Sequence, residues 1–138
     1  MISKSAQETK KIAAKLAKKI LKEKPHQKHA RVIALTGELG AGKTTFVQGF
    51  AKALGIKSRM VSPTFLIFRK YKNFYHVDVY RIHSTKELDV LNFKSILNSS
   101  ENILLIEWAE KIRKILPKDA IWVNFRHGRK ENERFIAY

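Results

Sequence analysis

The sequence predicts an α/β fold in which a central, mostly parallel sheet is flanked by helices and extended by antiparallel hairpins. Short apolar runs rich in β-branched residues alternate with amphipathic helical runs along the chain, an order typical of parallel sheets with crossover helices. One apolar run also leads directly through the glycine-rich stretch GELGAGKT into a helical run. At 138 residues and 44% hydrophobic content, the chain suits one domain over residues 1–138.

The first elements expected are a helix, a strand and a second helix. Ser5 and Glu8 have the spacing of a capping box, and apolar residues then repeat at helical intervals. Residues 31–36 are apolar and β-branched, which predicts a buried strand. Residues 44–54 carry an apolar helical face, and Gly55 stands where a helix C-terminal glycine belongs.

The second half of the chain predicts a hairpin, a helix and three further strands. Aromatic and β-branched runs separated by two residues favour the hairpin, and a second capping-box spacing at Ser84 favours the helix. The expected elements are strands at 64–71 and 74–81, a helix at 84–97, a strand at 102–108, a short helix at 109–115 and two strands after Pro117.

Composition excludes several classes of protein. Without cysteines, the chain forms no disulfide and no thiolate zinc site. No apolar stretch approaches the roughly 20 residues of a membrane span, so we expect a cytoplasmic protein without a membrane partner. The formal net charge of +16 has two interpretations that stay open: a basic face for RNA, nucleotides or an acidic partner, or a lysine-rich solvated surface.

The glycine-rich stretch fits the phosphate-binding P-loop pattern G-x-x-x-x-G-K-[ST]. Glycines let the backbone curl so that successive N–H groups point at phosphate oxygens. Lys43 would add a charge on the β- and γ-phosphates, and the hydroxyl of Thr44 would bind Mg²⁺. The alternative is a glycine turn that only packs a helix onto a strand. The expected phosphate-binding residues are Gly37, Glu38, Leu39, Gly40, Ala41, Gly42, Lys43, Thr44 and Thr45.

Two acidic residues stand at expected strand positions. Glu107 ends the run ILLI, where a parallel strand would present it beside the P-loop, as a Walker B acid is presented. Asp78 lies between Val77 and Val79, so its carboxylate needs a partner or a metal. The alternatives are a surface ion pair for Glu107 and a structural partner, Tyr80 or Arg81, for Asp78.

Histidines and aromatic residues give weaker signals. His76 and His83 invite a metal-ligand interpretation, but without cysteines or a close histidine pair we assign them no metal. The aromatic residues of the hairpin suit either a base-stacking platform or, more commonly, a packed face. Trp108, directly after Glu107, is either a core residue or a cover over a nucleotide or partner.

Five motifs in order resemble the bacterial TsaE (YjeE) ATPases. They are GELGAGKTTF, SPTF at 62–65, HVDVYR at 76–81, KEL at 86–88 and LIEWAEKI at 105–112. The resemblance spans residues 5–115, and the combination of SPTF, HVDVYR and IEW at these intervals is specific. It implies a small Mg²⁺-dependent ATPase that works with the proteins TsaD and TsaB to make N6-threonylcarbamoyladenosine at position 37 of tRNAs that read ANN codons.

The resemblance also implies roles for particular residues. Thr44 and Glu107 would hold Mg²⁺, Lys43 would bind phosphate, and Asp78 would be a catalytic acid near the γ-phosphate. Thr64 would lie in a switch-like loop, Trp108 beside the active site, and Thr9 near the adenine. TsaD itself would perform the transfer, so this chain would meet tRNA mainly through the complex, with at most a weak direct contact.

The chain departs from the family pattern at two positions. The family usually has glycine near Asn92, so the local turn is expected to differ, and IEW is commonly followed by proline where this chain has Ala109. Neither departure touches the phosphate chemistry.

Two other classes of function stay open on the residues alone. A small-molecule kinase would share the P-loop but would usually need a lid with arginines and an acceptor pocket, for which 138 residues leave little room. A basic RNA-binding domain without catalysis would explain the charge but would leave Lys43, Asp78 and Glu107 without a role.

Overall fold

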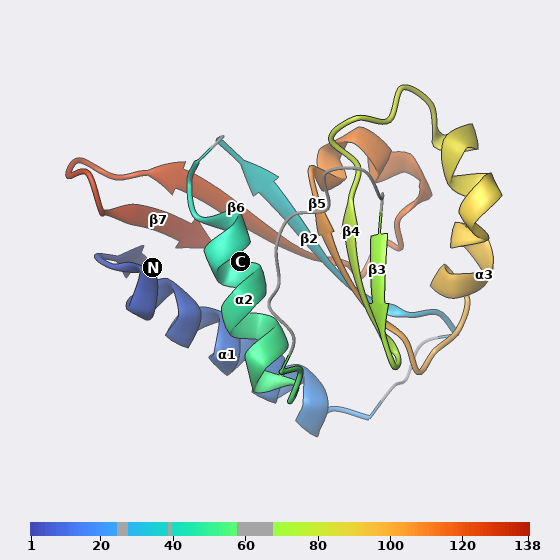
Figure 1. Cartoon of the computed structure of the whole chain (residues 1–138), viewed down its shortest axis with the longest axis horizontal. Coiled ribbons are helices and arrows are strands. Elements are labelled where there is room, and N and C mark those ends of the chain that lie inside the picture. Colours follow the sequence, from blue (N-terminus) through green and yellow to red (C-terminus); the bar gives the residue numbers. More distant parts are fainter. Residues whose placement is uncertain (25–27, 39, 58–67) are drawn as a thin grey trace. The chain divides into compact units, whose positions relative to one another are not determined.

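The predicted α/β fold is confirmed by the computed structural model, which describes residues 1–24, 28–38, 40–57 and 68–138 (Figure 1). The described strands form a seven-stranded sheet in the order β1-β7-β6-β2-β5-β4-β3. Strands β2, β5 and β4 run parallel, whereas β3, β7 and β1 form antiparallel pairs. The strands are β1 Ile2–Ser3, β2 Arg31–Gly37, β3 Phe68–Tyr71, β4 Phe74–Asp78, β5 Ile103–Glu107, β6 Ile121–His127 and β7 Arg134–Ala137.

The contacts of the chain divide it into two compact units. Unit 1 comprises Met1–Lys24, Thr36–Ser62 and Val123–Tyr138, and unit 2 comprises Pro25–Leu35 and Pro63–Trp122. Strand β2 begins in unit 2 and ends in unit 1. Each unit therefore carries part of the predicted site.

Helix α1, Ala6–Lys22, begins in unit 1 as its sequence predicts. The Ser5 hydroxyl accepts a hydrogen bond from the Glu8 N–H at 3.1 Å, which satisfies one of the unpaired donors of the first turn. The Glu8 carboxylate accepts from the N–H of Lys4 at 2.6 Å, one residue earlier than in the usual capping box. The cap thus fixes the helix start next to β1.

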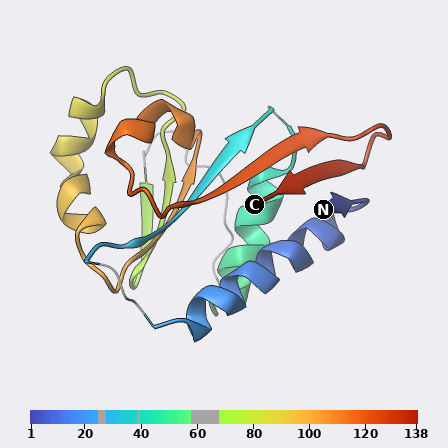
Figure 2. The ribbon, with the colours of Figure 1, turned by 180° about the vertical axis from the view of Figure 1, so that it is seen from behind.

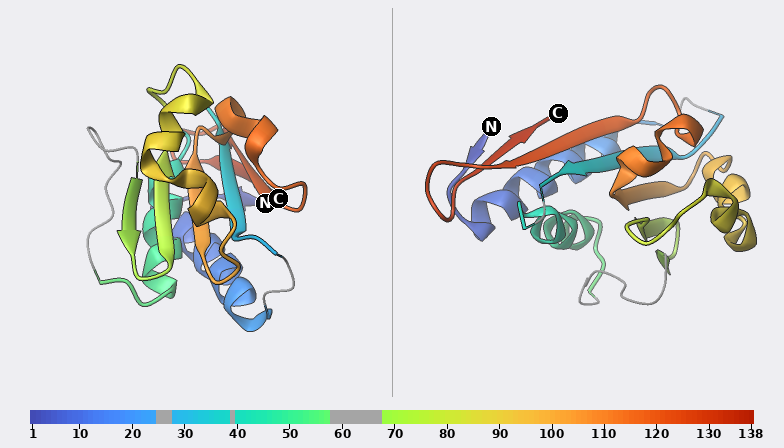
Figure 3. Two further views of the ribbon diagram at one scale, coloured as in Figure 1. Left: turned by 90° about the vertical axis from the view of Figure 1, so that its right-hand side faces the viewer. Right: turned by 90° about the horizontal axis from the view of Figure 1, so that it is seen from above.

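Helix α2, Lys43–Ala53, lies beside α1 in unit 1 (Figures 1 and 3). Gly49 permits the close approach, because a Cβ built on it would lie 2.6 Å from the Cα of Lys10. The opposite side of α2 packs through Phe46, whose ring meets that of Phe125 edge-on with centroids 5.3 Å apart. Aromatic contact on one side and a glycine on the other hold α2 in place.

Strands β6 and β7 form an antiparallel hairpin, and β1 pairs with β7 (Figure 2). The two tail strands were predicted, but β1 was not, because two residues carry no detectable alternation. The amino group of Met1 donates to the carbonyl of Ile136 at 2.8 Å. Strand β1 thereby covers the edge of β7.

In unit 2, β4 and β5 run parallel in register, with His76 opposite Leu105 and Asp78 opposite Glu107. The β3–β4 hairpin is confirmed (Figure 3). Lys72 in its two-residue turn has a φ of 55°. Strand β4 ends at Asp78 rather than at 81. Of the predicted first hairpin strand, residues 64–67 lie outside the described residues.

The unit 2 strands have an apolar face and a partly polar face. Alternate residues of the strands, among them Val32, Val77 and Leu104, belong to a buried cluster with residues of the neighbouring helical segments. The intervening residues His76, Asp78 and Glu107 therefore point to the opposite face, since successive strand residues alternate. The predicted acids share this second face.

The predicted helix over 84–97 is wrong as a single element. The chain forms a 3₁₀ helix, η1, at Thr85–Leu91 and a short α-helix, α3, at Phe93–Leu97. Asn92 separates them because it adopts the left-handed conformation, with φ 55°, which asparagine tolerates better than most residues. The family usually has glycine near this position, and glycine also favours the left-handed conformation. The chain can therefore make a sharp turn at Asn92 without that glycine.

The start of η1 agrees with the sequence, whereas the segment after β5 differs from expectation. The capping box at Ser84 is confirmed, and the backbone N–H groups of His83 and then Ser84 lower the pKa of Glu87 by hydrogen bonding its carboxylate. The segment Ala109–Ile115 is a 3₁₀ helix, η2, rather than an α-helix. Its backbone departs from helical geometry at Ile112, so a regular α-helix does not form.

Candidate functional site

The P-loop joins β2 to α2 within unit 1 and has the backbone geometry that its glycines predict. Gly37, Gly40 and Gly42 all have positive φ values, of 135°, 74° and 97°, which residues with a Cβ rarely adopt. Leu39, one of the predicted phosphate-binding residues, lies outside the described residues. The described part of the loop therefore turns as a glycine-dependent loop should.

The three glycines serve different purposes. A Cβ on Gly37 would lie 2.1 Å from the carbonyl oxygen of Phe125, so this glycine permits close packing against β6. A Cβ on Gly40 or Gly42 would meet no atom nearer than 3.9 Å. At these two positions the left-handed backbone, rather than packing, requires glycine, so the interpretation of the loop as a packing turn explains only Gly37.

The side chain of Lys43, at the end of the loop, is hydrogen-bonded to the residue at its start. This side chain is only 6% exposed, and its Nζ donates to the carbonyl of Gly37 at 2.8 Å. Ala41 is buried, and its N–H donates to the carbonyl of Glu38 at 3.2 Å. The ammonium group thus lies over the loop at the N-terminus of α2, where backbone N–H groups attract an anion.

The remaining P-loop residues differ in exposure. Thr44 is exposed and Thr45 half-buried on the first turn of α2. Glu38 is exposed, and one of its carboxylate oxygens lies 3.7 Å from Nε2 of His127. Thr44 is therefore accessible to a ligand at the start of the helix.

Three residues beyond the motif lie around the loop. The Thr9 methyl group and Cγ of Arg134 lie 4.0 and 3.9 Å from a Cβ built on Gly42, and the ring of His127 lies 3.9 Å from one built on Gly40. Thr9 is buried, and its hydroxyl shares a 2.7 Å hydrogen bond with that of Ser3. Thr9 was predicted from the family's N-terminus. His127 and Arg134 were not predicted, because the only signal was the basic character of the turn HGRKENER.

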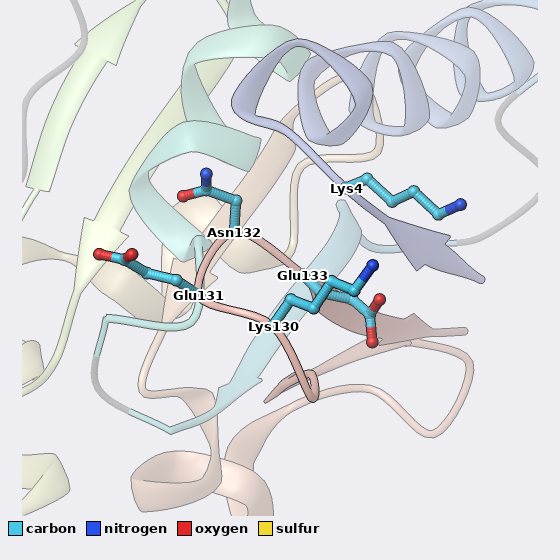
Figure 4. A pocket seen from close by; sticks show the side chains of 5 residues that line it. All are labelled: Lys4, Lys130, Glu131, Asn132 and Glu133. Carbon is cyan, nitrogen blue, oxygen red and sulfur yellow. The ribbon is translucent and has the colours of Figure 1, made fainter.

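The turn between β6 and β7 lines a cavity of about 420 Å³ (Figure 4). Arg134 shapes this turn, because its Nη1 donates to the carbonyls of Glu131 and Glu133 at 2.6 and 2.9 Å. Both signs of charge border the cavity, which is lined by Lys4, Lys130, Glu131, Asn132 and Glu133. The same arginine thus links the turn to Gly42 of the P-loop.

Asp78 and Glu107 lie on adjacent strands of unit 2. They are register partners at the ends of β4 and β5, where neighbouring strands are about 4.8 Å apart and side chains in register share a face. Asp78 is half-buried, and its Oδ1 accepts the N–H of Tyr80 at 2.9 Å. Glu107 is 3% exposed. Two carboxylates side by side at this depth favour a cation between or beside them.

His76 supplies a hydrogen bond to one of these acids. It is fully buried, and its Nε2 lies 2.6 Å from Oε2 of Glu107. His83, the other histidine considered as a metal ligand, is exposed. The pairing of His76 with Glu107 was not predicted, because it depends on strand alignment between residues 31 positions apart.

Trp108, directly after Glu107, adopts an unusual backbone conformation. Its φ is 59°, a region that a bulky residue rarely occupies and that concentrates at functional sites. Its ring lies 5.0 Å from that of the exposed Tyr80, and Lys111 donates to the carbonyl of Tyr80. Trp108 is half-buried, so its ring can contribute to a surface next to the acids.

Glu107 pairs in register with the strand that leads into the P-loop. Leu35 of β2 is the register partner of Glu107, and Gly37 follows Leu35 by two residues. Within unit 2, the parallel pairing places Glu107 at the C-terminal end of β5, the end of a strand at which open α/β sheets bind ligands.

The donor atoms of these residues fit Mg²⁺ better than a transition metal. Hydroxyl and carboxylate oxygens are hard ligands, and Mg²⁺ is usually held by one or two protein groups together with phosphates and water. Within the described ranges, no cluster of three or more histidine, cysteine or acidic residues could hold a metal by itself. Taken singly, the hydroxyl of Thr44 in unit 1 and the carboxylate of Glu107 in unit 2 are each oxygen donors of the kind that Mg²⁺ prefers.

Comparison with known proteins identifies the family. A sequence profile described as "Threonylcarbamoyl adenosine biosynthesis protein TsaE" matches residues 3–136. The chain belongs to the TsaE family. Relatives named "tRNA threonylcarbamoyladenosine biosynthesis protein TsaE" include those of Haemophilus influenzae and Rickettsia felis, which are 38% and 40% identical over 73% and 90% of this chain. The alignments cover 66% and 70% of those proteins.

A solved structure has the same fold. The crystal structure of Bacillus subtilis YdiB superposes with a TM-score of 0.69 and 32% sequence identity, covering 99% of this chain and 80% of that one. In addition, no helix among the described residues combines the length and the apolar character that crossing a membrane requires. The family is one named for biosynthesis of a modified tRNA nucleoside.

Proposed function

We propose that this chain is a Mg²⁺-dependent ATPase that serves the biosynthesis of N6-threonylcarbamoyladenosine in tRNA. The observation that carries the proposal is the pairing of Glu107 with Leu35, two residues before a P-loop whose Gly40 and Gly42 are required by backbone conformation alone. A loop that only packed a helix onto a strand would not need Gly40 or Gly42. It would also not need a buried acid in register with Leu35. The family name supports the place of the reaction in tRNA modification.

In this proposal the loop residues bind the triphosphate. Lys43 exchanges its hydrogen bond with the Gly37 carbonyl for contacts with phosphate oxygens, which are stronger because both groups are charged. Thr44 and Glu107 hold Mg²⁺, which neutralises charge on the phosphates when bound. The helix N-terminus adds its partial positive charge.

Asp78 is the acidic residue that we propose acts as a general base on the attacking water. Its Oδ1 is oriented by the Tyr80 N–H, which fixes the carboxylate at the end of β4. A carboxylate held beside the metal-binding acid can orient a water molecule and accept its proton. The half-buried position of Asp78 permits access to water.

The partners proposed are TsaD and TsaB, in the cytoplasm, with tRNA contacted through their complex. This assignment rests on the family resemblance and on the names of the relatives, which place them in threonylcarbamoyladenosine biosynthesis. The half-buried Trp108 and the exposed Tyr80, which lie beside the acids, offer an aromatic surface from which a bound partner could influence the site.

The first test is ATP binding and phosphate release without an added acceptor. The protein should bind ATP, and Lys43→Ala should weaken binding by about 10-fold or more, because a charge-assisted hydrogen bond to phosphate is worth roughly 1.5–3 kcal/mol. Lys52→Ala, at an exposed position on the same helix, is the control and should bind normally. Phosphate release that required an acceptor would favour a kinase, and absence of ATP binding would favour the RNA-binding alternative.

A second prediction concerns the positive charge. Helix α1 carries six lysines and one glutamate, and Lys11, Lys15, Lys18 and Lys22 recur at helical spacing on its exposed side. If they form a basic face, the affinity for a polyanion should fall steeply as salt rises, because each neutralised phosphate releases counterions. We expect direct tRNA binding to be weak and largely independent of sequence.

The measurement compares the salt dependence of tRNA binding between two quadruple variants of equal charge. Replacing Lys11, Lys15, Lys18 and Lys22 by glutamine should flatten the dependence. Replacing the exposed Lys86, Lys94, Lys114 and Lys118 by glutamine should change it less. Equal slopes for both variants would favour a lysine-rich solvated surface without a preferred face.

A further inference from the structure

We propose that His76 is a positioning residue that holds the carboxylate of Glu107 in the orientation needed to bind the nucleotide's metal. The inference rests on the proposed function and adds a residue to it. The two side chains come from adjacent parallel strands, and His76 Nε2 lies 2.6 Å from Glu107 Oε2. Both side chains are almost wholly removed from solvent, at 0% and 4% exposure.

Burial makes this hydrogen bond consequential. Water cannot replace His76 as a partner of Oε2, because neither side chain is open to solvent, and a buried carboxylate oxygen without a partner is costly. The hydrogen bond from His76 restrains Oε2 of Glu107, and it thereby also restrains the direction in which the other carboxylate oxygen points. Groups that orient metal ligands in this way commonly change metal affinity by about 10–100-fold when removed.

The two ring nitrogens of His76 have unequal environments. Nε2 faces the acid, whereas Nδ1 is buried and has no hydrogen-bond partner within the described part of the chain. A proton on Nε2 satisfies the carboxylate and leaves only a weak acceptor unpaired, whereas a proton on Nδ1 would bury an unpaired donor. The geometry therefore selects the tautomer that donates to Glu107.

Packing alone does not explain a histidine at this position. His76 stands in a strand whose buried neighbours Phe74, Tyr75 and Val77 are apolar or aromatic, and an apolar residue there would avoid burying an unpaired Nδ1. The hydrogen bond from the ring to Glu107 offsets the free-energy cost of burying the unpaired Nδ1. If His76 acts through Glu107, its substitution should weaken the binding of the metal. The affinity for nucleotide in the absence of metal should change less.

Two amide substitutions distinguish the role of the hydrogen-bond donor from that of the imidazole ring. The amide nitrogen of glutamine is as many bonds from Cα as Nε2, whereas that of asparagine is as many bonds from Cα as Nδ1. His76→Gln can therefore donate to Glu107, and His76→Asn cannot reach it. Both variants replace the ring by an uncharged amide, so their thermal unfolding without metal provides a matched measure of lost packing.

The experiment measures Mn²⁺ binding to the ADP complex by electron paramagnetic resonance, with ADP affinity in EDTA measured in parallel. His76→Asn should weaken Mn²⁺ binding by about 10-fold or more, and His76→Gln should recover most of the loss. ADP affinity in EDTA should stay near that of the unmodified chain for both. Equal Mn²⁺ affinities for the two variants would overturn the proposal, whatever their stabilities.

Glu107→Gln distinguishes this inference from the proposed function. If that substitution leaves Mn²⁺ affinity unchanged, the assignment of Glu107 to the metal is wrong and the proposed site fails with it. If Glu107→Gln weakens Mn²⁺ binding and His76→Asn does not, only the positioning role of His76 is wrong.

A measurement on the unmodified chain keeps the inference testable even if His76→Asn does not fold. Nitrogen-15 NMR of the His76 ring in the metal-free protein should show the proton on Nε2 and a bare Nδ1. The Nε2–H should be protected from exchange with solvent, and Glu107→Gln should alter its signal more than that of the exposed His83. An Nε2 without a proton would contradict the donor role.

Discussion

Asp78→Asn should leave ATP binding nearly intact and reduce hydrolysis by about 100-fold or more, the range expected for loss of a general base. Asparagine keeps a side-chain oxygen that can accept the Tyr80 N–H now bonded to Oδ1 of Asp78 at 2.9 Å. The turn at the end of β4 should therefore survive. What is lost is the negative charge and the ability to take a proton from water.

The measurement is kcat and KM for phosphate release, together with ATP affinity by equilibrium binding. A fall in kcat at unchanged affinity assigns Asp78 to the reaction rather than to binding. Asp89→Asn makes the same chemical change at an exposed position in unit 2 and should hydrolyse ATP at the normal rate. Normal turnover by Asp78→Asn would show that its catalytic assignment is wrong.

The part of the site that could be predicted from the sequence is the part encoded locally. The P-loop has fixed spacing between its glycines and Lys43, and its backbone conformation depends on those same residues. Glu107 was placed by the end of an apolar run that became β5. In both cases the signal and the structure occupy the same short segment.

The parts that were missed depend on tertiary pairing. His76 meets Glu107 only because β4 and β5 align in one register, and Arg134 reaches Gly42 from the far end of the chain. A one-residue shift of either strand would turn the side chain to the other face. Sequence patterns alone do not fix such register.

Short elements show a related limit. The helical pattern after Ser84 continues through Asn92, yet the left-handed backbone of that residue divides the segment into η1 and α3. The two-residue β1 has no periodicity of its own and forms because it pairs with β7. In these segments, tertiary contacts and single backbone conformations override periodicity.

Addition of the TsaD–TsaB complex should raise ATP turnover by roughly 10³-fold or more, the effect of completing transition-state stabilisation in P-loop enzymes. Within the described residues, the arginine next to Gly42 is Arg134, and its Nη1 already donates to the carbonyls of Glu131 and Glu133. Arg134 thus maintains the turn through hydrogen bonds that it would have to give up in order to bind a phosphate. A group supplied by the partners, or a loop ordered by docking, is therefore expected to complete the site.

Thr64, which lies outside the described residues, resembles the switch-like threonine of the family and is the residue of this chain through which we expect the partners to act. Stimulation should raise kcat more than it lowers KM, since the added contacts form in the transition state. Phosphate release is measured with and without TsaD–TsaB, and with serum albumin as a protein control.

Full activity of the isolated chain, unchanged by the partners, would contradict this mechanism and point to an internal cation. Arg69 is then the residue to test. It is the register partner of His76, so it lies on the same face as the acids, and its buried Nε has no hydrogen-bond partner in the described part of the chain. In that case Arg69→Gln should lower kcat. If the partners are required, Arg69→Gln should leave the stimulated-to-basal ratio largely unchanged, because the decisive charge then comes from outside the chain.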